Sequence, residues 1–291
     1  METVYAIVVT FSPNLTKLKN QKDALINQVD GIIYVDNGSK EQNKIRHEVS
    51  QDCVFLGQST NLGIATAQNI GIQAAIEKGA THILLMDQDS IPEYNMVKEL
   101  INHIKQDSKL ACVGPKIING FNPDQIYCGI KIKGCYVHKY PVTENPIDVS
   151  YCIASGSLIP IDIIADVGLM KDEMFIDGVD LEWGLRAKSM GYNIQIIPHA
   201  TLIHELGNGN SNIILSHSST REYYIIRNNL ILMRFNYIPM GYKFRKLIFN
   251  FGRIAKSLFL NDKSYFKKAM AGTKDGLRYL FSGSNLNLQN K

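Results

Sequence analysis

The chain has 291 residues, 45% of them hydrophobic and 20% charged, which suits one large α/β domain or two closely fused lobes and excludes a disordered chain. The apolar run at residues 4–9 is too short for a signal peptide, and no apolar run reaches the ~18 residues that a membrane span needs, so we expect a cytoplasmic protein. The five cysteines form no CxxC pair and are odd in number, which favours reduced thiols over a disulfide framework or a zinc site.

The net charge of +4 is unevenly distributed along the chain. Residues 221–291 carry 14 Lys and Arg against 3 Asp and Glu, so the part before them is net acidic. A basic C-terminal region indicates an anionic partner surface, either nucleic acid or phospholipid headgroups.

The first half of the chain alternates strands with helices. A β-branched strand at residues 4–10 precedes a helix at 15–26, and a second apolar strand at 31–36 ends in Asp36. An acid at the carboxyl end of a parallel strand can accept hydrogen bonds from a ribose or a base. The alternative is that Asp36 only opens a turn.

A third strand at residues 53–56 leads into a helix that ends near Glu77. Gly63, Ala67 and Gly71 lie on one face of this helix and predict close packing on the sheet. With the strand that follows, the alternation predicts a mostly parallel sheet with right-handed crossovers.

The strand at residues 83–86 is apolar throughout and runs out into Asp87 and Asp89. Two carboxylates at the carboxyl end of a buried strand are suited to a divalent cation such as Mg²⁺ or Mn²⁺, and through it to a diphosphate. The alternative is that both acids only end the strand and cap the next helix.

The middle of the chain gives weaker signals. A helix is expected at residues 92–108 and a strand at 110–115, whereas residues 117–149 read as irregular strands or a flexible flap. The Ala-Ser-Gly-Ser turn around Gly156 could bring backbone amides to a ligand, or could be ordinary turn chemistry.

A second acidic cluster precedes a helix that closes at Gly191. Asp180 lies at the expected start of this helix, where it either caps the helix or removes the proton from an attacking sugar hydroxyl. After a strand at residues 193–197, His204 could supply a nitrogen to the same metal, although a lone histidine is more often structural.

Five motifs in this order resemble glycosyltransferase family 2, over residues 4–235. The resemblance is carried by Val-Thr-Phe-Ser-Pro, Val-Asp-Asn-Gly-Ser, Asn-Leu-Gly-Ile-Ala-x-Ala-Gln-Asn-x-Gly, Leu-Met-Asp-Gln-Asp-Ser and Phe-Ile-Asp-x-Val-Asp-x-Glu-Trp-x-Leu-Arg-Ala with a following His. Within the family, the Asp-Gln-Asp-Ser form and the Phe-Ile-Asp-x-Val-Asp-x-Glu-Trp block are similar to bacterial rhamnosyltransferases.

The resemblance implies an α/β fold of the GT-A type, a Rossmann-like, mostly parallel sheet flanked by helices. Residues 1–220 would form the catalytic domain, with a nucleotide-sugar half at about 1–115 and an acceptor half at about 116–220. Residues 221–291 would form a helical basic extension.

The resemblance also implies roles for the acids and their neighbours. Residues that contact the nucleotide-sugar donor would be Thr10, Asp36 and Asp87, to which the turn argument above adds Gly156. Asp89 and His204 would hold Mg²⁺ or Mn²⁺, and Asp180 would be the catalytic base.

The reaction so implied is inverting sugar transfer in one in-line displacement, with dTDP-L-rhamnose as donor. The acceptor would be a saccharide on a polyprenyl diphosphate carrier, in cell-surface polysaccharide synthesis. A family 2 enzyme using a UDP-hexose or galactofuranose donor is an alternative, and a non-catalytic scaffold of an assembly complex is an alternative of another class. A nucleotidyltransferase is disfavoured because residues 9–13 contain neither Gly nor Lys.

The basic region contains one amphipathic segment at residues 233–260. Helical spacing gathers apolar residues on one side of it: Leu247, Ile248, Phe251, Ile254, Ala255 and Leu258. Such a helix either packs on the catalytic domain with its basic face in solvent, or lies on the inner face of the cell membrane as a peripheral anchor. Nucleic acid is disfavoured, since no binding motif accompanies the charge.

Overall fold

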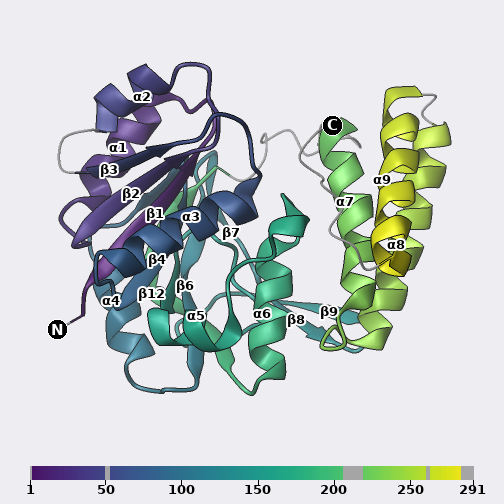
Figure 1. Cartoon of the computed structure of the whole chain (residues 1–291). Coiled ribbons are helices and arrows are strands. Elements are labelled where there is room, and N and C mark those ends of the chain that lie inside the picture. The colour runs from purple at the N-terminus through teal and green to yellow at the C-terminus, as the bar shows by residue number, and fades with distance from the viewer. Residues whose placement is uncertain (1, 50–52, 206–218, 260–262, 283–291) are drawn as a thin grey trace.

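A ten-stranded sheet organises the computed structural model, which describes residues 2–49, 53–205, 219–259 and 263–282 (Figure 1). The strand order is β10-β12-β6-β11-β4-β1-β2-β3, with β5 paired to β12 and β7 paired to β6. The strands are β1 Val4–Thr10, β2 Gly31–Asp36, β3 Cys53–Gly57, β4 His82–Asp87, β5 Ser90–Pro92, β6 Leu110–Asn119, β7 Asn122–Ile126, β8 Gly129–Lys133, β9 Tyr136–Tyr140, β10 Ile147–Asp148, β11 Ser157–Pro160 and β12 Asn193–His204.

Helices cover both faces of the sheet. Those of the first 205 residues are α1 Leu15–Leu25, α2 Gln42–Val49, α3 Ile64–Glu77, α4 Met96–Ile104, α5 Ile161–Val167 and α6 Val179–Ser189. One core layer joins the sheet to α3, α5 and α6, and a second joins its other face to α1, α2 and α4. The expected α/β class with a flanked central sheet is confirmed.

The β3-β2-β1-β4 half of the sheet is parallel, as the alternating pattern predicts. Its strands are apolar on both sides because helices cover both faces. Gly71 of α3 confirms the close packing expected on that helix face, since a Cβ there would lie 2.3 Å from Ile7 Cγ2.

The other half of the sheet is mixed, which the sequence pattern did not predict. β11 runs antiparallel to both of its neighbours, β4 and β6, whereas β12 runs parallel to β6. Because β4, β6 and β12 therefore run in the same direction, their carboxyl ends lie at the same edge of the sheet. Asp87 at the end of β4 and His204 at the end of β12 therefore lie at one edge of the sheet.

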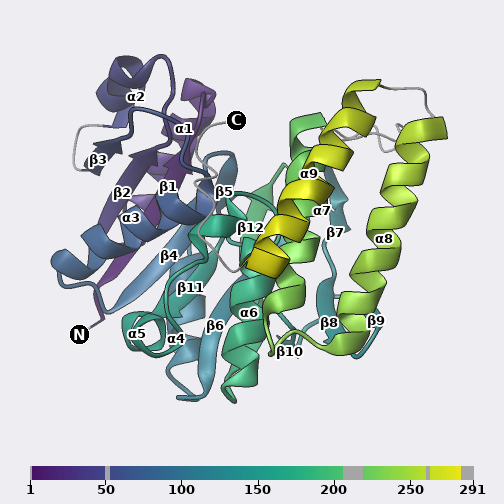
Figure 2. The ribbon, with the colours of Figure 1, turned by 45° about the vertical axis from the view of Figure 1, so that its right-hand side comes forward.

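Residues 117–149 are strands rather than a flexible flap. β8 and β9 form a separate two-stranded hairpin. Its turn packs on the start of a C-terminal helix, because a Cβ on Gly241 would lie 2.6 Å from Cys135 N (Figure 2).

Three helices follow the sheet: α7 Ser219–Ile231, α8 Met240–Phe259 and α9 Lys263–Ser282. In Figures 1 and 2 they stand beside the sheet rather than over either face. Gly272 of α9 allows close contact with α7, since a Cβ there would lie 2.4 Å from Tyr223 O. In the described part of the chain, no helix is both long and apolar enough to cross a membrane.

Candidate active site

Two carboxylates and one imidazole meet where β4 and β12 end and β5 begins. β4 ends at Asp87, the chain turns through Asp89, and β5 begins at Ser90, which is the register partner of His204 on β12. This antiparallel pairing places the side chain of His204 between the two acids. The structure therefore joins all three residues that the sequence suggested for the diphosphate and metal.

The distances within this cluster suit a shared cation. His204 Nε2 lies 3.4 Å from Asp87 Oδ2, and His204 Nδ1 lies 3.4 Å from Asp89 Oδ1. One ligand atom from each residue lies within 4.8 Å of the others, and the buried Nδ1 atom has no hydrogen-bond partner among the described residues. Two carboxylate oxygens and one imidazole nitrogen are a donor set that Mg²⁺ and Mn²⁺ accept.

The electrostatics of the cluster also favour a cation. Burial raises the pKa of Asp89, and the charge of Asp87 adds to this effect. Burial alone would lower the pKa of His204, but its hydrogen bond and charge interaction with Asp87, together with Asp89, raise it overall. Asp87 thus contributes to both shifts, and a divalent cation would neutralise the negative charge that the two acids bring together.

Polar side chains from elsewhere fix the turn that carries these acids. The amide of Gln21 on α1 donates to the carbonyls of Asp87 and Ser90. Ser155 Oγ accepts from Asp87 N at 3.3 Å and donates to Ser90 Oγ at 2.6 Å. These contacts all come from the protein itself and hold the turn that carries the acids.

Thr10 and Asp36 lie together at the neighbouring strand ends. Thr10 Oγ1 donates to Asp36 Oδ2 at 2.9 Å, and both side chains are buried. Asp36 also accepts from Ser39 N and Ser39 Oγ, at 2.9 and 2.6 Å. The carboxylate thus has three donors from the protein, and its contact with a nucleotide stays a prediction.

Gly156 has a clear packing role in this structure. Its φ of +85° favours glycine, and a Cβ would lie 2.5 Å from Pro115 Cγ. Its amide donates to Leu85 O at 2.8 Å, so this N–H is already satisfied. A contact between Gly156 and the donor also stays a prediction.

Asp180 lies in the first turn of α6 and does not cap it. The N-cap position belongs to Gly178, which has a φ of +86° and makes no side-chain cap hydrogen bond. Burial, followed by the charge of Asp87, raises the pKa of Asp180 to about 7, although the backbone amide of Ala154 acts in the opposite direction. A carboxylate with this pKa can accept a proton near neutral pH.

The loop before α6 is strained and is held by side chains that the sequence analysis missed. Phe175 and Asp177 have φ values of +58° and +66°, in a region that side chains rarely adopt. Asn228 of α7 donates to the carbonyls of Met174, Ile176 and Asp177, at 2.6 to 2.8 Å. The available sequence signal was the polar run at residues 227–229, which stands between the apolar pairs at 225–226 and 230–231.

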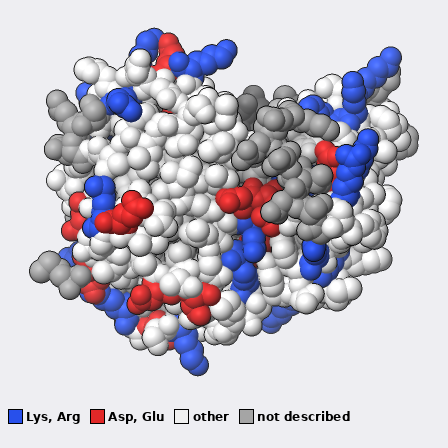
Figure 3. All heavy atoms as spheres, in the orientation of Figure 1, with Lys and Arg blue, Asp and Glu red and all other residues white. Residues whose placement is uncertain are grey.

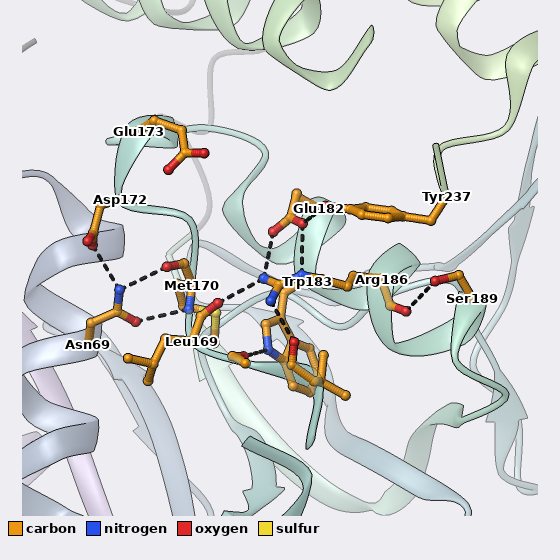
Figure 4. A network of polar contacts seen from close by, with 12 residues as sticks. Asn69, Leu169, Met170, Asp172, Glu173, Glu182, Trp183, Arg186, Ser189 and Tyr237 are labelled. Atoms are coloured by element: carbon orange, nitrogen blue, oxygen red, sulfur yellow. Dashed lines mark hydrogen bonds and ion pairs between the residues drawn. The ribbon is translucent and has the colours of Figure 1, made fainter. Parts of the chain in front are cut away.

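A buried ion pair between Glu182 and Arg186 also holds α6 in place (Figure 4). Glu182 is fully buried and receives two bonds of 2.9 Å from Arg186, which also donates to the carbonyls of Val167 and Leu169. Trp183 Nε1 donates to Gly168 O at 2.9 Å. The conspicuous Glu-Trp-x-x-Arg block therefore anchors α6, the helix that carries Asp180, to the carbonyls of Val167, Gly168 and Leu169.

A cavity of about 450 Å³ opens beside Asp180, between α6, α7 and α8. Besides Asp180, its charged lining consists of Asp177, Arg221, Lys246 and Arg253. We call it the α6–α8 cavity. Asp87, Asp89 and His204, which we call the carboxylate–imidazole cluster, do not line this cavity.

The chain is similar in sequence to known glycosyltransferases. The profile of glycosyl transferase family 2 matches residues 8–154. The dTDP-rhamnosyl transferase RfbF of Shigella flexneri is 34% identical over 299 residues, covering 98% of each chain. Galactofuranosyltransferase GlfT1 of Mycolicibacterium smegmatis is 26% identical over 240 residues, covering 76% of this chain and 77% of its own.

Among solved structures, GalNAc-T7 with UDP, GalNAc and Mn²⁺ has a similar fold. The TM-score is 0.60 at 15% sequence identity, and the match covers 90% of this chain and 58% of that one. With the profile match and the full-length similarity to RfbF, these findings show that the chain is a glycosyltransferase and belongs to glycosyltransferase family 2.

Proposed function

We propose that this enzyme transfers L-rhamnose from dTDP-L-rhamnose to a lipid-linked saccharide during synthesis of a cell-surface polysaccharide. The donor is supported by the full-length similarity to a dTDP-rhamnosyl transferase. The observation that carries the chemistry is the carboxylate–imidazole cluster of Asp87, Asp89 and His204. It lies close enough to Asp180 that the charge of Asp87 contributes to the raised pKa of Asp180.

In the proposed mechanism, the chain's residues position a donor and activate an acceptor. Asp87, Asp89 and His204 would hold Mg²⁺ or Mn²⁺, and the chemistry supplied by the bound ion is stabilisation of negative charge on the departing diphosphate. Asp180 accepts the proton of the attacking hydroxyl in the α6–α8 cavity. One displacement inverts the anomeric carbon, and no residue forms a covalent intermediate.

A panel of nucleotide sugars tests the donor. With Mn²⁺ present, we expect dTDP-L-rhamnose to be hydrolysed or transferred at least about tenfold faster, in kcat/KM, than UDP-galactose, UDP-glucose or UDP-galactofuranose. Release of the nucleoside diphosphate gives the rate. Preference for UDP-galactofuranose would instead favour the function named for GlfT1, and no turnover of any donor would contradict an enzymatic role.

We further propose that α8 rests on the inner face of the membrane. Several of its polar residues face the protein: Asn250 accepts from the Asn229 amide at 2.7 Å, and Arg253 pairs with Glu222. A stripe of apolar residues at a spacing of three and four is exposed, next to the exposed Arg245: Phe244, Ile248, Phe251, Ala255 and Leu258. This arrangement is opposite to a helix packed on the domain with its basic face in solvent, and it suits an interfacial helix.

Replacing Phe244 and Phe251 by serine tests this placement. They are 64% and 72% exposed, and we expect each change to weaken co-sedimentation with anionic vesicles about tenfold, because a buried aromatic ring contributes roughly 1.5–3 kcal/mol. Tyr94→Ser is the matched control, since Tyr94 is 87% exposed but lies before α4. Failure of the unaltered protein to bind anionic vesicles at low salt would contradict the proposal.

A further inference from the structure

Lys246 lines two adjoining hollows of different character. One is the α6–α8 cavity, which contains Asp180. The other is a groove of about 390 Å³ lined by Val137 of β9 and by Tyr242, Arg245, Lys246, Ile248 and Phe249 of α8, which we call the β9–α8 groove. Tyr242, Lys246 and Phe249 are common to both. The two hollows therefore adjoin at these three residues, and Lys246 is the charged one among them.

The cations of the α6–α8 cavity differ in how they are paired. Arg221 binds both carboxylate oxygens of Asp177 at 2.7 to 3.0 Å, and Arg253 pairs with the buried Glu222. In contrast, no carboxylate among the described residues lies within 4 Å of Lys246 Nζ. Its ammonium lies instead over two aromatic rings, 5.2 Å from the centre of Tyr242 and 5.8 Å from that of Phe249.

Lys246 is therefore a half-buried cation whose surroundings favour an added anion. Burial lowers its pKa to about 8, with the charges of Arg245 and Arg253 acting in the same direction and that of Asp177, which is already paired with Arg221, acting against them. The negative charge of a phosphate placed beside Lys246 would favour its charged form, and the two groups would form charge-assisted hydrogen bonds. On the face drawn in Figure 3, acidic side chains gather where the sheet meets the C-terminal helices, with Lys and Arg beside them.

We propose that Lys246 binds the phosphate that joins the acceptor saccharide to its lipid carrier. The saccharide then lies in the α6–α8 cavity with its hydroxyl at Asp180, and the first hydrocarbon units lie in the β9–α8 groove against Ile248 and Phe249. The ligand has a polar saccharide, an anionic phosphate and an apolar lipid in that order. They match the α6–α8 cavity, Lys246 and the β9–α8 groove, in the same order. The inference rests on the proposed function, because it assumes that Asp180 faces an acceptor.

Binding of simple probes to the full chain tests the site without turnover. In buffer with EDTA, which removes any contribution from a metal, we expect farnesyl diphosphate to bind more tightly than inorganic diphosphate or farnesol. Lys246→Met should weaken farnesyl diphosphate binding about tenfold or more, since a charge-assisted contact is lost. Ile248→Ser should weaken binding of farnesyl diphosphate but not of inorganic diphosphate.

Three controls separate this inference from its alternatives. Lys267→Met, which removes an exposed cation of α9, should leave all affinities unchanged. Lys246→Arg should retain most of the binding, and Lys246→Met should leave affinity for dTDP with Mn²⁺ unchanged. Equal affinity of the unaltered protein and Lys246→Met for farnesyl diphosphate would overturn the proposal, as would equal binding of farnesyl and inorganic diphosphate. If no nucleotide sugar is turned over but these probes bind as expected, only the proposed reaction fails.

Discussion

Asp180→Asn should lower kcat by about 10²–10⁴-fold while leaving affinity for dTDP with Mn²⁺ nearly unchanged. The amide keeps the shape of the carboxylate but cannot accept the proton of the acceptor hydroxyl. Helix stability should be almost unaffected, because Gly178 holds the N-cap position of α6. Single-turnover and steady-state rates with the preferred donor would measure the effect.

Asp177→Asn is the matched control for this substitution. Asp177 lines the same cavity and carries the same charge, but it is bound to Arg221 and lies in a positive-φ conformation that asparagine tolerates. We expect its effect on kcat to be at least about tenfold smaller than that of Asp180→Asn, because it is not the proton acceptor. A near-normal kcat for Asp180→Asn would remove Asp180 from the catalytic role.

Asp180→Asn should also change the pH profile of the reaction rate. The deprotonated form of Asp180 is the active base, and burial and Asp87 raise its pKa to about 7, so the rate should fall as pH drops through this value and level off above it. The titratable groups around it include Asp177, Tyr151 and Cys152, and the same cavity is lined by Tyr242, Lys246, Arg221 and Arg253. A cation bound at Asp87 would weaken the repulsion, so we expect the midpoint at or below pH 7. Residual activity of Asp180→Asn should lack this acidic limb.

The sequence predicted the parallel half of the sheet well because its strands carry a strong local signal. β1, β2 and β4 are apolar runs buried on both faces, and α3 has the small residues that close packing requires. In contrast, α2 contains only Ile45 and Val49 as buried residues, and β7 is exposed throughout. Elements with so little apolar surface give no periodic pattern to detect.

The candidate site was predictable residue by residue, but its assembly was not. Asp89 and His204 are far apart in sequence and meet only because β5, a strand of three residues, pairs with the end of β12. Likewise, the apolar stripe of α8 was visible from spacing, but its outward direction depends on Asn229 and Glu222 of α7, which take up its polar side. Spacing along one segment carries no information on such partners.

Asp89→Ala should abolish metal-dependent donor binding. Loss of outer-shell partners already weakens metal binding by about 10–100-fold, so loss of one of three direct ligands should cost about 100-fold or more. Calorimetric titration of Mn²⁺, alone and with dTDP, measures both affinities, and chelation with EDTA should reproduce the loss in the unaltered enzyme. Asp89 lies in a turn with 38% of its side chain exposed, so the fold should tolerate the change.

Glu205→Gln is the comparison that makes this result specific. Glu205 follows His204, and its charge also acts on Asp89, but it pairs with Lys17 of α1 and is not part of the carboxylate–imidazole cluster. If charge near the site were sufficient, both substitutions would weaken Mn²⁺ binding equally. If Asp89 is a ligand, Glu205→Gln should retain affinity within about fivefold, since a screened neighbouring charge contributes at most about 1 kcal/mol. Unchanged Mn²⁺ affinity in Asp89→Ala would exclude Asp89 as a ligand and leave Asp87 and His204 as an ordinary ion pair.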